Sequence, residues 1–257
     1  MSSVRLVDSM GSDSAIVQAA RVSYGAGTKS VSDDRALIRY LMRHKHTTPF
    51  EMVEFKFHIK APIFVARQWL RHRTASVNEL SARYSIVSDE YFLPDEFRKQ
   101  STNRGQGGEE AYEGSDETSL LLKQKTSCDL AFHTYEELIK KGVSRELART
   151  HLPQSTFTEF YWKINLHNLL HFLQLRMDDH AQKEIQDLAK QIYELIKPIC
   201  PATCEAFEDF RLGSLTLSRL EVEAIRCNSL VHAPPSIPGK GENAEWEQKL
   251  AKLFATN

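Results

Sequence analysis

The stretch Val53-Glu54-Phe55-Lys56-Phe57-His58-Ile59-Lys60 alternates strictly between apolar and polar residues. Successive side chains of a β-strand point to opposite faces, so this pattern predicts a strand that is buried on one face only. Pro62 follows closely, and proline suits the first turn of a helix because its missing N–H would be unpaired there. We therefore expect a half-buried strand, followed by a helix from Ile63 to about His72.

That helix leads into the polar run Arg71-His72-Arg73-Thr74-Ala75-Ser76-Val77-Asn78-Glu79-Leu80-Ser81-Ala82-Arg83-Tyr84. The run contains three arginines and one histidine but only one acidic residue, a glutamate. Planar guanidinium groups bind phosphate through paired hydrogen bonds, and backbone N–H groups of an irregular stretch can also point at an anion. The run therefore predicts an anion-binding site. For any one arginine, the alternative is a solvated turn with structural salt bridges.

The rest of the chain predicts mixed secondary structure. Val4 to Val7 and Thr156 to Ile164 have the composition of strands. Pro49 is expected to end a helical region. The expected class is α+β, a single mixed domain with a small, mainly antiparallel sheet flanked by helices. The helices are expected over residues 13–23, 32–43, 119–141, 145–152, 166–176, 179–197, 203–210 and 218–227.

Domain organisation follows from the less regular segments. We expect residues 1–230 to form the domain, because no internal repeat or sharp boundary divides them. Residues 232–241 contain three prolines, so residues 231–257 are expected to be a linker and a C-terminal helix. Residues 98–118 are polar and contain glycine, which predicts a mobile loop, either a lid over a site or a plain surface loop.

Composition narrows the class of protein. A hydrophobic content of 41% with 26% charged residues is typical of a globular protein with a real core. The net charge of −1 argues against general attraction to nucleic acid or to an anionic membrane. No apolar run approaches the roughly 20 residues of a membrane span. We expect a cytoplasmic protein, because no secretory signal is evident and the four cysteines suit reduced thiols.

The run from Arg71 to Tyr84 matches the pattern Arg-His-Arg-x-x-Ser-x-Asn-x-x-Ser-x-Arg-Tyr at every fixed position. It thereby resembles the signature of the flavin-dependent thymidylate synthases. The resemblance covers about Val4 to Phe210, without residues 98–118. Other segments resemble the family's blocks in the family's order: His46–Glu51, Lys60–Trp69, Ala148–Arg149 before Leu152–Pro153, and Leu175–Arg176 before His180–Gln182.

The resemblance implies the family's fold and its reaction. The family methylates dUMP to dTMP, with 5,10-methylenetetrahydrofolate as carbon donor and FAD, reduced by NADPH, as hydride source. It uses no cysteine nucleophile and no metal. The resemblance also implies a homotetramer whose subunits share each active site.

The resemblance assigns Arg176 as the catalytic residue, facing the pyrimidine ring and stabilising its N3-deprotonated form. A guanidinium suits that role because it stays charged. From its surroundings in sequence alone, Arg176 could instead pair with Asp178 or Asp179. Ser81 is expected to bind rather than attack, since a serine nucleophile needs an adjacent base. The implied dUMP ligands are Gln68, Arg71, Glu79, Leu80, Ser81, Ala82, Arg83, Arg149 and Arg176.

The same resemblance implies a flavin site. No G-x-G-x-x-G fingerprint appears in the sequence, so we do not expect the flavin to be held as in dinucleotide-binding folds. Two positions depart from many relatives: Ala82 stands where glycine is common, and His171 where some relatives have asparagine. His46 and Tyr84 are expected to contact the flavin or the folate. The implied FAD ligands are Thr48, Arg71, His72, Arg73, Glu79, Asn165, Leu166, His167 and His171.

Two other classes of function compete with this one. His167 and His171 lie four apart, a spacing that can bind zinc on a helix, with His180 or Asp179 as a third ligand. However, Asn168 stands where a zinc hydrolase has its glutamate base. A non-catalytic nucleotide- or RNA-binding module would use the cations of residues 71–84, but would leave the roles of Arg149 and Arg176 unexplained.

Overall fold

The structure, a computed structural model, describes the chain except for residues 23–30, 101–109, 227–239 and 255–257. The described residues divide into two compact units, Met1–Phe207 and Glu208–Asn257. The predicted domain boundary near residue 230 lies outside the described residues, as does the middle of the predicted 98–118 loop. Both stay predictions.

A four-stranded antiparallel sheet organises the first unit. Its strands are β1 (Ser3–Met10), β2 (Glu54–Pro62), β3 (Ser76–Glu79) and β4 (Phe157–Asn165), in the order β1-β2-β4-β3. The central strands β2 and β4 pair over their whole length. The predicted α+β class with a small antiparallel sheet is therefore confirmed.

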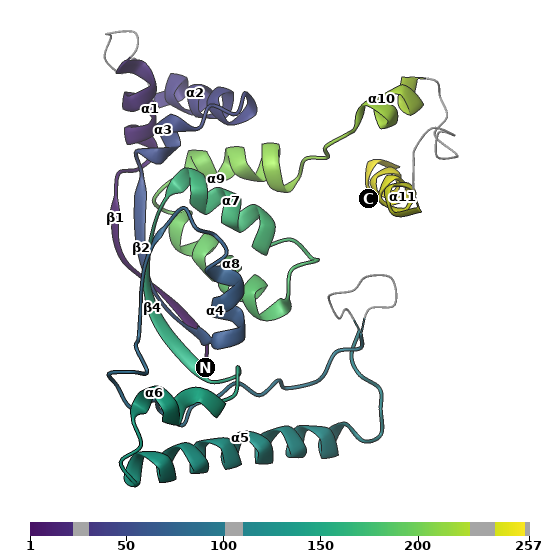
Figure 1. Ribbon diagram of the computed structural model, residues 1–257. Coiled ribbons are helices and arrows are strands. Elements are labelled where there is room, and N and C mark those ends of the chain that lie inside the picture. Colours follow the sequence, from purple (N-terminus) through teal and green to yellow (C-terminus); the bar gives the residue numbers. More distant parts are fainter. Residues whose placement is uncertain (23–30, 101–109, 227–239, 255–257) are drawn as a thin grey trace. The chain divides into compact units, whose positions relative to one another are not determined.

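Helices cover one face of this sheet. Figure 1 shows α4, α7 and α8 against that face, with α1 to α3 at one end of the unit and α5 and α6 at the other; α9 packs on α2. The helices of the unit are α1 (Asp13–Arg21), α2 (Val31–Arg43), α3 (Thr48–Glu51), α4 (Ile63–Trp69), α5 (Glu117–Lys140), α6 (Arg145–Ala148), α7 (Leu166–Arg176), α8 (Lys183–Ile196) and α9 (Pro201–Phe207), with a short 3-10 turn at Arg149–His151.

The alternating residues 53–60 form the predicted strand with one buried face. Phe55, Phe57 and Ile59 of β2 are fully buried under the helices. The opposite face of the sheet is polar and carries ion pairs between strands, such as Lys163 with Glu54 at 3.0 Å. The sheet therefore has one side packed in the core and one polar side.

Trp69 at the end of α4 joins the helices to the sheet. It is fully buried, and its ring centroid lies 5.2 Å from that of Trp162 and 4.7 Å from that of Phe172. We expect Trp69→Ala to lower the free energy of unfolding by about 3–5 kcal/mol, because it removes this contact and leaves a cavity. Urea unfolding measures the change. Leu122→Ala on exposed α5 is the control, and equal losses in the two variants would contradict this role of Trp69.

Two expectations about local structure were wrong, and one strand had not been expected. Pro49 does not end a helix; it lies in the first turn of α3. No strand was expected at Ser76–Glu79, and these residues form β3 against β4. The helix expected from residue 179 begins at Lys183, because Asp178 accepts the His180 N–H at 2.8 Å and holds a turn ahead of it.

The second unit has a small core of its own. It contains a π-helical turn at Glu208–Leu212 and the helices α10 (Arg219–Arg226) and α11 (Lys240–Phe254). Trp246 and Ala224 are buried together between the two helices. Glu221 is also buried and pairs with Lys249 at 2.8 Å. None of the helices described in either unit is long and apolar enough to cross a membrane.

Candidate functional site

The predicted site residues form separate groups. The first group lies where the end of α7 meets the segment after α4. The Arg176 Nε–H donates a hydrogen bond to His72 Nε2 at 3.1 Å. The His72 ring packs against Phe172, with centroids 4.9 Å apart, and lies 6.1 Å from the ring of His171. Arg176 therefore contacts His72, while the carboxylate of Asp178 contacts His180.

The hydrogen bond between Arg176 and His72 requires a neutral imidazole, because Nε2 accepts. Burial, then the charge of Arg176 and then His171, lower the pKa of His72 from 6.5 to about 4. Burial also lowers the pKa of the Arg176 guanidinium, but a group that titrates so far above neutrality remains a cation. The pair at pH 7 is thus an arginine cation held by a neutral acceptor.

This pKa shift predicts a pH dependence of stability. Between about pH 6.5 and pH 4 the unfolded chain binds a proton at His72 that the folded chain does not, so the free energy of unfolding falls as the pH falls. Urea unfolding at pH 7, 6 and 5 measures the loss. His72→Gln, whose amide oxygen can still accept from Arg176, should lose less stability over this range. An unchanged pH dependence in that variant contradicts the assignment.

Gln68 lies close to this pair in sequence, on α4. Its Nε2 donates to the side-chain oxygen of Gln182, which precedes α8. Sequence reasoning had assigned no role to Gln182. Arg71 and Arg73 follow α4 and are exposed. Among the described residues neither forms an ion pair, so their charges are available to an anion.

The second group of predicted residues lines a cavity of 440 Å³. The predicted residues in its wall are Glu79, Leu80, Ala82 and Arg149. Strand β3 holds Glu79 there: the Thr158 hydroxyl donates to Glu79 Oε1 at 2.7 Å, and the Leu80 N–H donates to the Glu159 carbonyl at 2.9 Å. Thr158 had no predicted role, because only the pairing of β3 with β4 brings it to Glu79.

A turn after β3 presents Ser81 and Arg83. The Tyr84 N–H donates to the Ser81 carbonyl at 3.0 Å, and the Arg83 N–H donates to the Ser81 hydroxyl at 3.4 Å. The Arg83 guanidinium lies over the Tyr84 ring, 5.3 Å from its centre. Arg145 of α6 donates to the Tyr84 carbonyl and so ties the turn to α6.

The two groups lie towards opposite ends of α4. Ile63, its first residue, lines the 440 Å³ cavity, whereas Gln68 is near its end and His72 follows it. Seven helical residues span about 10 Å. Gln68, Arg71 and Arg176 do not line the cavity that contains Arg149.

The remaining residues assigned to flavin lie where α3 packs on α7. Thr48 is the first residue of α3. Asn165 caps α7, its Oδ1 accepting the Asn168 N–H at 3.0 Å. Leu166 is fully buried, so its side chain belongs to the core, whereas His167 is half-buried. The His46 ring lies edge-on to Tyr40, with centroids 5.8 Å apart.

The zinc alternative finds no ligand set in the part of the chain that the structure describes. No group of three or more histidine, cysteine, aspartate or glutamate side chains there could hold a metal ion. His171 lies beside His72, and His180 contacts Asp178.

Comparison with known proteins bears on this arrangement. A family model described as Thymidylate synthase complementing protein (Thy1) matches residues 5–202. The flavin-dependent thymidylate synthase of Dictyostelium discoideum is 55% identical over 261 residues, covering 98% of this chain and 84% of that protein. The enzyme of the same name from Thermus thermophilus is 57% identical over 223 residues, covering 87% of this chain and 82% of that protein.

A solved structure is also similar. The UMP/dUMP methylase PolB from Streptomyces cacaoi, solved with 5-Br dUMP bound, superposes with a TM-score of 0.75 at 36% identity. The match covers 82% of this chain and 96% of PolB. Together with the family match over most of Met1–Phe207, these similarities show that the chain belongs to the flavin-dependent thymidylate synthase family.

Proposed function

We propose that the protein methylates dUMP to dTMP, with 5,10-methylenetetrahydrofolate as carbon donor and FAD, reduced by NADPH, as hydride source. Membership of the family and the likeness to PolB, a protein solved with a brominated dUMP, support this proposal. The observation that carries it in this chain is the half-buried Arg176 cation held by a neutral His72.

Arg176 has the chemistry to activate the pyrimidine. When N3 of uracil loses its proton, negative charge spreads over the ring, and a preorganised cation stabilises that charge. Because Nε donates to His72, the Nη groups are left to face a ligand. The exposed Arg71, Arg83 and Arg149 suit the phosphate, since guanidinium groups bind phosphate oxygens in pairs.

The residues also fit a flavin nucleotide. Arg71 and Arg73 are exposed cations without an ion pair among the described residues, which suits a diphosphate. Further polar contacts to the flavin would come from Thr48, Asn165, His167 and His171. The Asn165 side-chain oxygen already caps α7, which leaves its NH2 group for the flavin.

The reaction we propose uses no cysteine nucleophile. Cys128, Cys200 and Cys204 are buried, and burial raises the pKa of the Cys200 thiol well above its usual value. Buried thiols that stay protonated are poor nucleophiles. The Ser81 hydroxyl already accepts a backbone N–H, which supports a ligand role for it.

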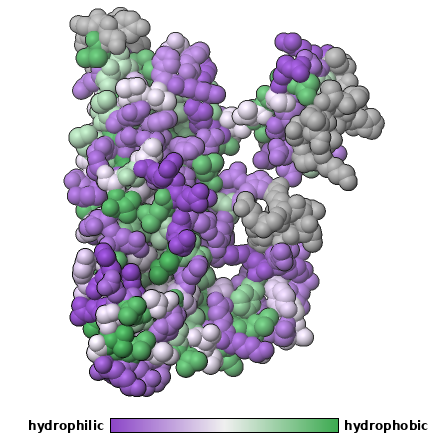
Figure 2. Space-filling view, viewed as in Figure 1, coloured by the Kyte–Doolittle hydropathy of each residue, from purple (hydrophilic) through white to green (hydrophobic). Residues whose placement is uncertain are grey.

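We further propose a homotetramer whose subunits share each active site. Leu80, Tyr84 and Ile86 beside the Ser81 turn and Leu147 in α6 are exposed, although large apolar side chains are usually buried. Arg145 ties α6 to that turn. Hydrophobic residues also appear on the surface over α5 and α6 in Figure 2. Such surfaces mark interaction sites, and a partner subunit would cover this one.

An anaerobic assay of dTMP formation from dUMP, methylenetetrahydrofolate and NADPH, with and without FAD, tests the function. We expect product only with FAD, and a flavin spectrum that is released on denaturation. Colourless protein that cannot be reconstituted and forms no dTMP would refute the proposal. Stoichiometric zinc would favour the hydrolase, and salt-sensitive RNA binding without dUMP affinity would favour the binding module.

A further inference from the structure

The core face of β4 changes character towards the start of the strand. Phe160, Trp162 and Ile164 lie on this face, and all three are apolar and buried. The next position on the same face is Thr158, which is buried as well, with 6% of its surface exposed. A polar side chain on the core face of a strand breaks the local pattern, and such breaks are expected at functional sites. Thr158 lies in the wall of the 440 Å³ cavity.

The pairing of β3 with β4 brings Thr158 to Glu79. Glu79 lies opposite Phe160 in this ladder, so Thr158 is its diagonal neighbour on the same face of the sheet. The Thr158 hydroxyl donates to Glu79 Oε1 at 2.7 Å. A hydrogen bond to a charged oxygen is stronger than one between neutral groups. The buried hydroxyl therefore holds one oxygen of a carboxylate that also lines the cavity.

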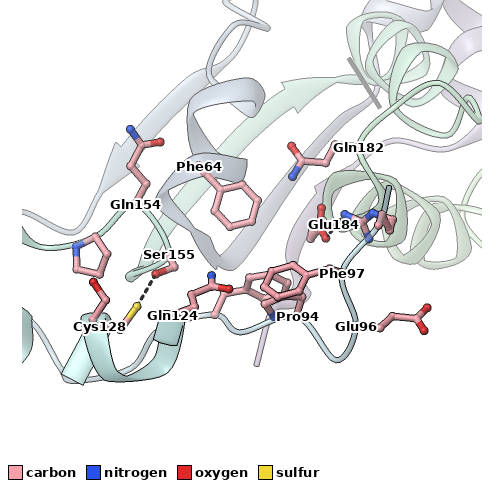
Figure 3. Close-up of a pocket in the computed structure, with 14 residues that line it drawn as sticks. Phe64, Pro94, Glu96, Phe97, Gln124, Cys128, Gln154, Ser155, Gln182 and Glu184 are labelled. Atoms are coloured by element: carbon pink, nitrogen blue, oxygen red, sulfur yellow. Dashed lines mark hydrogen bonds and ion pairs between the residues drawn. The ribbon is translucent and has the colours of Figure 1, made fainter. Parts of the chain in front are cut away.

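The backbone that carries Thr158 is fixed where β4 begins. The Ile63 N–H at the start of α4 donates to the Thr156 carbonyl at 2.9 Å, and the Phe64 N–H donates to the Gln154 carbonyl at 3.0 Å. Phe64 and Gln154 line a neighbouring cavity of 570 Å³ (Figure 3). Thr158 follows this junction by two residues and pairs with β2 on its other side. Its hydroxyl therefore has a rigid support.

The Glu79 side chain lacks such a support of its own. It is exposed and belongs to β3, an edge strand whose four residues are all exposed. Among the described residues, Thr158 is the one side chain that forms a hydrogen bond with this carboxylate, and it uses Oε1. Oε2 is thereby left as a charged acceptor at the cavity. A carboxylate oxygen only accepts hydrogen bonds, so a ligand must offer it an N–H or O–H group.

We propose that Thr158 is a positioning residue of the nucleotide site, which fixes Glu79 so that Oε2 accepts a hydrogen bond from dUMP. The sugar hydroxyl and the uracil N3–H of dUMP are donors of this kind. The inference rests on the proposed function, which assigns Glu79 to dUMP. The opposite dependence is the competing explanation: Glu79 would only provide a partner for a buried hydroxyl, and Thr158 would matter for folding alone.

Binding of dUMP to the full-length protein, measured by calorimetry in the presence of FAD, tests the proposal. Thr158→Val keeps the shape of the side chain and removes its hydroxyl. We expect dUMP to bind this variant about fivefold more weakly, because a side chain that is free to move must then be ordered by the ligand. Thr158→Ser keeps the hydroxyl and should bind dUMP within about twofold of the wild type.

Thr156→Val is the matched control. The Thr156 hydroxyl is buried two residues earlier and has no hydrogen-bond partner among the described residues. Its removal should leave dUMP affinity unchanged. If Thr158→Val does not fold, Thr158→Ser and Thr158→Ala provide the same comparison, because these two variants differ only by the hydroxyl.

A double-mutant cycle with Glu79→Ala separates positioning from a role in folding. If Thr158 acts through Glu79, Thr158→Val should cause no further loss of dUMP affinity in a chain that already carries Glu79→Ala. If Thr158 only maintains the shape of the cavity, the same fivefold loss should appear with and without Glu79. The cycle therefore gives different results for the two explanations.

Three results would each overturn the inference: unchanged dUMP affinity in Thr158→Val, an equal loss in Thr158→Ser, or a loss that persists beside Glu79→Ala. Wild-type protein that binds no dUMP would overturn the proposed function, and the inference with it. Wild-type protein that binds dUMP, together with any of the three results, would overturn the inference alone. The two failures are therefore distinguishable.

Discussion

Replacing Arg176 with alanine is expected to lower the rate of dTMP formation by roughly 10²–10³-fold, the usual effect of removing one preorganised group that stabilises charge in a transition state. The variant should still bind flavin, because the cations of the Arg71–Arg73 segment are retained. NADPH oxidation should continue without coupling to dTMP. Anaerobic single-turnover assays with product analysis measure both quantities.

Arg67→Ala is the matched control for this variant. Arg67 lies on α4, is exposed, and has no assigned role. Its removal should leave turnover within about twofold, as expected for a surface change away from the site. Turnover of Arg176→Ala near the wild-type rate would falsify the role assigned to Arg176.

Mixing two inactive variants, Arg149→Ala and Arg176→Ala, is expected to restore roughly a quarter of the wild-type activity. If each site takes its Arg149 group from one subunit and its Arg176 group from another, random mixing leaves both halves intact in about one site in four. Subunit exchange followed by assay measures the recovery.

The control combines Gln68→Ala with Arg176→Ala. Both changes affect the same half of the site, so no mixture restores an intact half and activity should stay low. If Arg149→Ala with Arg176→Ala also recovers nothing, the two groups act within one chain. One bound nucleotide would then have to contact both the Arg149 group and the Arg176 group of the same chain.

The sequence predicted the central strands and α7 well. The alternation at residues 53–60 predicts a strand in a sheet with one buried face, and the structure has this sheet. Residues 166–176 matched α7 at both ends, and Asn165 is its cap. These features depend on local patterns that a single chain displays directly.

Edge strands and short helices were harder to predict. All four residues of β3 are exposed, so they show no alternation of burial. Pro49 is equally compatible with the end of one helix and the first turn of the next. Only the packing of α3 on α7 distinguishes these cases, and that packing involves residues far apart in sequence.

The candidate site was predicted through family resemblance, but its geometry was not. The contact between His72 and Arg176 joins residues 104 apart, and the one between Glu79 and Thr158 joins residues 79 apart. No spacing along the chain indicates either. From sequence alone a carboxylate partner for Arg176 was the obvious choice, and the structure has an imidazole in its place.

That choice of partner sets the net charge at the candidate catalytic residue. A carboxylate would hold the guanidinium equally well, but it would cancel the positive charge and repel an anionic pyrimidine. Neutral His72 fixes the direction of the arginine without reducing its field. Orientation and electrostatic strength are therefore supplied by different residues. A redesign of this position could alter one and keep the other.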